Sequence, residues 1–90
     1  MNGKQKQVLI DYESRLSRNE LADFLETIAS KIREEGSFTF VQPTGDVRID
    51  FPEGLKVEVE YEIENGEHVF EIEIEWREGA AGSTGKMEIL

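Results

Sequence analysis

Glutamate is the abundant residue in this sequence whose side chain could take part in chemistry. It recurs at alternate positions in two runs, Leu55–Glu64 and Glu67–Arg77. Carboxylates in such a pattern could act as an acid/base pair, coordinate a divalent cation or attract a basic partner. The candidate partner-binding acidic face consists of Glu58, Glu60, Glu62, Glu71, Glu73 and Glu75.

Catalysis and metal binding are the less favoured uses of these carboxylates. An acid/base pair needs one carboxyl group in an apolar pocket, which an open sheet face does not provide. A calcium site across Glu58, Glu60, Glu71 and Glu73 would draw few ligands per ion, because strand side chains project in parallel. The single histidine, His68, stands beside a turn with no catalytic partner in its neighbourhood. We therefore expect no catalytic, cofactor-binding or metal-binding residues.

Charge and composition narrow the class of partner. The net charge is −10, and residues 37–90 hold 13 of the 20 acidic but only 4 of the 10 basic side chains. Such a field repels nucleic acid and anionic lipid and suits a basic protein partner. No run resembles a signal peptide or a membrane span. The absence of cysteine fits a reducing cytoplasm. A cytoplasmic protein with neither a nucleic-acid nor a membrane partner is expected.

A hairpin centred on Asn65-Gly66 positions the acidic residues. This dipeptide favours a type I′ turn, which needs positive φ at both central residues. A two-residue loop fixes the register of the flanking strands. Like charges opposite each other are destabilising by up to about 1 kcal/mol per pair. The predicted acidic-side pairs are Glu62 with Val69, Glu60 with Glu71, Glu58 with Glu73 and Lys56 with Glu75. The other predicted pairs are Glu64 with Glu67, Tyr61 with Phe70, Val59 with Ile72, Val57 with Ile74 and Leu55 with Trp76.

Three further elements precede this hairpin. Alternation predicts a strand over Gln7–Glu13. Ser17 and Glu20 have the spacing of a capping box, which predicts an amphipathic helix that runs to about Glu35 and stops at Gly36. A second hairpin is predicted from Ser37–Gln42 and Asp46–Phe51 around Pro43-Thr44-Gly45. Its inward side chains are expected to be Phe38, Phe40, Val47, Ile49 and Phe51.

The order of these parts resembles the Amphi-Trp domain family. The resemblance rests on the helix start Ser17-Arg18-Asn19-Glu20, the stop at Gly36 and an alternating strand that ends in tryptophan, Phe70–Trp76, and it covers residues 7–77. It implies a small domain, found largely in archaea and some bacteria, with a cytosolic setting. The family has no assigned activity, so the resemblance carries over no functional residues.

The predicted fold is α+β, with the order β-α-β-β-β-β and a single helix packed on one face of a mainly antiparallel sheet. The first strand could flank the second or close onto the last. Trp76 is expected on the core face as a lid. Residues 7–77 would form one domain, with flexible ends at 1–6 and 78–90.

Three functions remain open at this stage. A non-enzymatic interaction module that presents the acidic face to a basic partner leads. An accessory or stress-related protein with no fixed site comes second, and an enzyme or divalent-cation binder that uses paired glutamates comes third. The sequence does not identify the partner or the oligomeric state.

Overall fold

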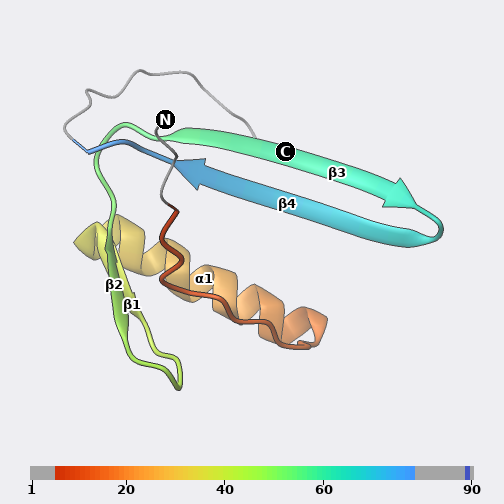
Figure 1. The fold of residues 1–90 in the computed structure, drawn as a ribbon, viewed down its shortest axis with the longest axis horizontal. Helices are drawn as coiled ribbons and strands as arrows, with labels where there is room; N and C mark the ends of the chain where they lie inside the picture. Colours follow the sequence, from red (N-terminus) through yellow and green to blue (C-terminus); the bar gives the residue numbers. More distant parts are fainter. Residues whose placement is uncertain (1–5, 79–88, 90) are drawn as a thin grey trace. The chain divides into compact units, whose positions relative to one another are not determined.

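The computed structural model describes residues 6–78 and 89, and this part of the chain holds one α-helix and four β-strands (Figure 1). Strands β1 and β2 form one antiparallel sheet, and β3 and β4 form another. The α+β class is therefore confirmed. The chain divides into two compact units, Met1–Phe51 and Pro52–Leu90. The elements are α1 (Arg18–Glu35), β1 (Ser37–Phe40), β2 (Val47–Asp50), β3 (Lys56–Glu64) and β4 (Glu67–Glu75).

Helix α1 begins and ends as the sequence predicts. The Glu20 N–H donates to Ser17 Oγ at 3.1 Å, and the Ser17 N–H donates to Glu20 Oε1 at 2.9 Å, which is a complete capping box. At the other end Gly36 takes φ 69°, and its N–H donates to the Ile32 carbonyl at 3.0 Å. Glycine has no Cβ, so it takes this left-handed conformation without strain. Within the described residues no helix has both the length and the apolar character of a membrane span.

The β1–β2 hairpin follows directly from the helix stop. The Phe51 N–H donates to the Gly36 carbonyl at 2.8 Å, and the Phe38 and Phe51 rings lie 5.6 Å apart. The hairpin turns where the Gly45 N–H donates to the Gln42 carbonyl at 3.0 Å. Helix α1 packs against β1. The predicted inward residues are all half-buried, but the least exposed residue of the hairpin is one that the sequence does not single out, Ser37, at 5%. The half-buried predicted residues are Phe38, Phe40, Val47, Ile49 and Phe51.

The predicted strand over Gln7–Glu13 is wrong, because residues 6–17 form neither strand nor helix. A strand needs a partner for its backbone groups, and no strand pairs with this segment among the described residues. Two contacts made by side chains hold it instead. Gln42 Nε2 donates to the Leu9 carbonyl at 3.0 Å, and the rings of Tyr12 and Phe40 meet edge to face at 6.0 Å.

The β3–β4 hairpin turns at Asn65-Gly66 as predicted. Asn65 has φ 51° and Gly66 has φ 79°, which confirms positive φ at both positions of the type I′ turn. The eight predicted pairs from Lys56–Glu75 to Glu64–Glu67 are all confirmed in the register. Leu55 and Trp76 lie just beyond the ends of the two strands.

Two expectations about sheet and core are wrong. The predicted single, mainly antiparallel sheet is found as two antiparallel two-stranded sheets, β1–β2 and β3–β4. Trp76 is not the buried lid that the sequence predicts, because its side chain is 39% exposed. Among the described residues no hydrophobic side chain is buried. The predicted flexible ends, 1–6 and 78–90, fall almost wholly outside the described residues.

Candidate functional site

The acidic face is one side of the β3–β4 hairpin. The register sets Glu60 opposite Glu71 and Glu58 opposite Glu73, so the two predicted pairs of like charge are confirmed. Alternation of strand side chains then places Glu62 and Glu75 on the same side. All six glutamates of this face are exposed. The face therefore presents a double row of carboxylates to solvent.

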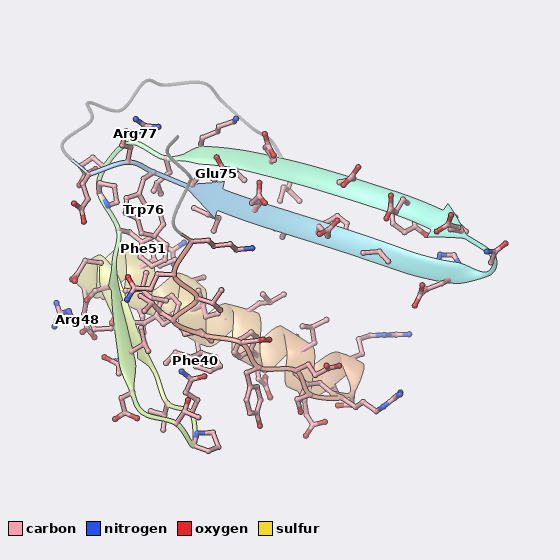
Figure 2. All side chains as sticks on the ribbon, in the orientation of Figure 1. Phe40, Arg48, Phe51, Glu75, Trp76 and Arg77 are labelled. Atoms are coloured by element: carbon pink, nitrogen blue, oxygen red, sulfur yellow. The ribbon has the colours of Figure 1, made fainter. Side chains whose placement is uncertain are left out.

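The carboxylates gather most closely at the end of the hairpin away from the turn. The oxygens of Glu58, Glu73 and Glu75 lie within 4.8 Å of one another. Figure 2 shows Glu75 at the end of β4, directly before Trp76 and Arg77. Hydrogen bonding to Glu75 and then to Glu58, reinforced by their negative charges, raises the pKa of Glu73 to about 7. Within this cluster the neighbours of Glu73 therefore favour its protonated form.

Lys56 makes the pKa shifts of two members of this cluster, Glu58 and Glu73, opposite in direction. Its Nζ lies 3.1 Å from Glu58 Oε1. That hydrogen bond and the lysine charge lower the pKa of Glu58, and in return Glu58 raises the pKa of Lys56. Repulsion between Glu58 and Glu73 by itself predicts that both pKa values rise. For Glu58 this prediction is wrong, because the cation 3.1 Å away outweighs the anion opposite.

At the turn end of the hairpin, two residues lie on a different face from the one that the sequence pattern predicts. The sequence pattern groups Glu64 and Glu67 with the apolar pairs, but alternation from Glu62 puts them on the acidic side. Ile63 opposite His68 completes the apolar side in their place. The sequence predicts that His68 is an exposed strand residue without a partner. It is exposed, but it has a partner on this side.

That partner is Tyr61, which the sequence does not single out. Its Oη lies 2.6 Å from His68 Nδ1, and the two rings stack with their centres 5.9 Å apart. The two residues are diagonal neighbours across the hairpin, a relation that the register alone would have revealed. Both side chains of this pair are exposed.

The carboxylate cluster differs from the metal site considered from the sequence. It contains Glu58 and Glu73 but takes Glu75 as its third member, and Glu60 and Glu71 are not part of it. All three members are exposed, and Lys56 already neutralises one of them. Calcium favours a cage of six to eight oxygens. Three carboxylates on an open sheet face supply only part of such a cage.

The raised pKa of Glu73 has its cause in the neighbouring carboxylates and not in burial, because Glu73 is exposed. In some carboxylate enzymes an apolar pocket raises the pKa of the acid by desolvation, and in others a second carboxylate close by raises it.

A separate hollow of about 320 Å³ lies between α1 and β1 in the first unit. Its only charged group is Lys31, whose Nζ forms an ion pair with Glu35 at 3.0 Å. An apolar site for a small molecule normally adds several converging polar groups that orient the ligand. Apart from Lys31, the polar side chains that line this hollow are two threonines. Its lining residues are Phe24, Thr27, Ile28, Lys31, Phe38, Thr39, Phe40 and Val41.

Comparison with known proteins identifies the family but no characterised relative. No curated protein and no solved structure matches this sequence. The family model for the Amphi-Trp domain matches residues 4–90. The match begins before the segment on which the resemblance was based and extends beyond Trp76. This chain therefore belongs to the Amphi-Trp domain family.

Proposed function

We propose that this domain is a non-enzymatic interaction module whose acidic face binds a basic protein partner. The observation that carries the proposal is the in-register double row of exposed glutamates on β3 and β4. Repulsion within such rows reduces stability, so a partner that supplies positive charge would relieve it. Lysine- and arginine-rich segments have the matching chemistry. A cytoplasmic location is part of the proposal, since the protein needs no disulfide.

The proposed complex should form quickly and weaken with salt. Complementary charge on an exposed surface mainly raises the association rate, and added salt screens it. At about 0.15 M ionic strength the Debye length is about 8 Å, so the rows would act only on a partner in close contact. Binding would therefore require that the basic segment lie along the hairpin.

The test uses charge reversal at two matched locations. Glu60→Lys with Glu73→Lys changes the acidic face, whereas Glu26→Lys with Glu34→Lys makes the same substitutions on α1, and the comparison is made at about pH 8.5, above the pKa of Glu73, so that the change of net charge is nearly equal. Binding of a fluorescent arginine-rich peptide is measured by anisotropy at several salt concentrations. The proposal expects the hairpin variant to lose binding and the helix variant to keep most of it. Equal loss in both variants would mean that net charge alone attracts the peptide.

The same experiment separates the alternatives. If neither the peptide nor native partners captured from a host extract bind to the acidic face, the domain is an accessory protein with a solvated surface. A divalent-cation role would appear as calcium binding in titration calorimetry that Glu73→Gln and Glu75→Gln abolish. The Lys56–Glu58 ion pair at 3.1 Å weighs against that role, because a cation would compete with the ammonium group.

A further inference from the structure

The Asn65-Gly66 turn combines reactive chemistry with an exposed position. Asparagine is among the thermolabile residues. It is most labile before glycine, because a residue without a Cβ leaves its backbone nitrogen open to approach. Both turn residues are exposed, and apart from Gly66 itself and its two chain neighbours no heavy atom lies within 4 Å of where a Cβ would stand on it. Among the described residues no side-chain hydrogen bond restrains the Asn65 carboxamide.

The local charges favour opening of this turn. The pair that closes it is Glu64 opposite Glu67, two like charges at the end of the ladder. Like charges in directly opposed positions destabilise a strand pair. The ends of elements also open at far lower free energy than their centres. Opening matters because the Gly66 nitrogen must approach Asn65 Cγ, and the backbone has to leave the turn conformation to allow this.

From these observations we propose that Asn65 is a site of spontaneous deamidation. The Gly66 nitrogen attacks Asn65 Cγ, a new bond between these two atoms closes a succinimide ring, and the bond from Cγ to Nδ2 breaks. The Gly66 amide proton passes through water to the departing ammonia. Water then opens the ring at either carbonyl and leaves aspartate or isoaspartate. The balance is one water consumed and one ammonia released, and no oxidant or reductant takes part.

The isoaspartyl product would change the hairpin and not only its charge. Its backbone runs through what was the carboxamide carbon of Asn65, so the turn gains one backbone carbon. A two-residue turn fixes the register of the strands that it joins. The added carbon is incompatible with the positive-φ pair of 51° and 79° that now closes β3 onto β4. The pairs nearest the turn should therefore separate first.

The sequence supplies its own reference residues for a test. It has three asparagines, of which Asn2 also precedes a glycine, whereas Asn19 precedes Glu20 within α1. The intact protein is incubated in mildly alkaline buffer until half of Asn2 is converted, and then digested with trypsin. The peptide Val57–Arg77 contains Asn65 as its only asparagine. Its mass increase, and its labelling by isoaspartyl methyltransferase, report the conversion.

The expected result is conversion of Asn65 at a rate within roughly tenfold of that of Asn2, with Asn19 intact, because an exposed hairpin end opens readily. The variant Asn65→Gly retains a sequence suited to a type I′ turn and should remove the label from this peptide. Conversion of Asn65 more than tenfold slower than that of Asn2 would overturn the proposal. An isoaspartyl fraction whose nuclear Overhauser contacts between Glu64 and Glu67 are unchanged would contradict the proposed change in the hairpin, since this pair lies nearest the turn.

Discussion

Replacing Ser17 with alanine is expected to lower the free energy of unfolding by about 1 kcal/mol. Ser17 Oγ accepts the Glu20 N–H at 3.1 Å, and this N–H is one of the four amides that a helix start leaves without a partner inside the helix. Alanine removes the acceptor. The helix start is exposed, so water can take its place, which keeps the loss well below that of a buried donor.

A thermal melt followed by circular dichroism measures this loss. For a domain of 60–100 residues, 1 kcal/mol corresponds to a fall of about 4–8 °C in the melting temperature. Ser30→Ala is the matched control, because Ser30 lies inside α1, where alanine is the better helix former. It should leave the melting temperature unchanged or raise it slightly. If both variants melt at the same temperature, Ser17 does not stabilise the helix in solution.

The pH dependence tests the other half of the capping box. Hydrogen bonds from the Ser17 backbone and side chain lower the pKa of Glu20 below 4.5. A lowered carboxyl pKa adds stability above its unfolded value, and this stability is lost as the pH falls through the folded value. The difference in the free energy of unfolding between Ser17→Ala and the parent protein should therefore be greatest above about pH 4.5 and should shrink in acid. A difference that grows in acid would refute the capping-box argument.

Gly66→Val should lower the free energy of unfolding by about 1–2 kcal/mol, because valine would have to adopt φ 79°. Asn65→Gly should leave it nearly unchanged, and equal melting temperatures for the two variants would contradict this reasoning. The raised pKa of Glu73, about 7, contributes stability that is full below the unfolded pKa and lost as the pH rises through 7. Carbon-detected NMR titration should find this pKa, and Glu75→Gln should lower it. Melting temperature should also be higher in about 1 M than in about 10 mM salt, and Glu60→Lys with Glu73→Lys should reduce that difference.

The features that local chemistry determines were predictable from the sequence. Eight of the nine pairs of β3–β4 follow from the alternation and from a turn type that Asn65-Gly66 strongly favours. The bounds of α1 follow in the same way from Ser17, Glu20 and Gly36, each of which acts within four residues of its own position. The side of the hairpin on which each glutamate lies depends on this register alone, and the sequence pattern misplaced only Glu64 and Glu67.

The features that depend on distant partners were not predictable. The alternation over Gln7–Glu13 does satisfy a strand pattern, but a pattern cannot supply the neighbouring strand that would accept its hydrogen bonds. The lowered pKa of Glu58 depends on the rotamer that brings Lys56 Nζ to 3.1 Å, and several rotatable bonds separate that atom from the backbone. The 39% exposure of Trp76, which follows the end of β4, likewise could not be read from the alternation of that strand.

The acidic rows also bear on self-association through strand edges. Strands that add in register to a sheet edge stack about 4.8 Å apart, as they do in amyloid, and an alternating run such as β3 has a favourable pattern for this. In parallel stacking, every copy of β3 would set Glu58, Glu60 and Glu62 beside the same residues of its neighbour, so repulsion would grow with each strand added. By this argument the glutamates would oppose the growth of fibrils through β3, as charged residues flanking aggregation-prone strands do in other proteins. Acid and concentrated salt remove that protection together, and the protein should be stored away from both.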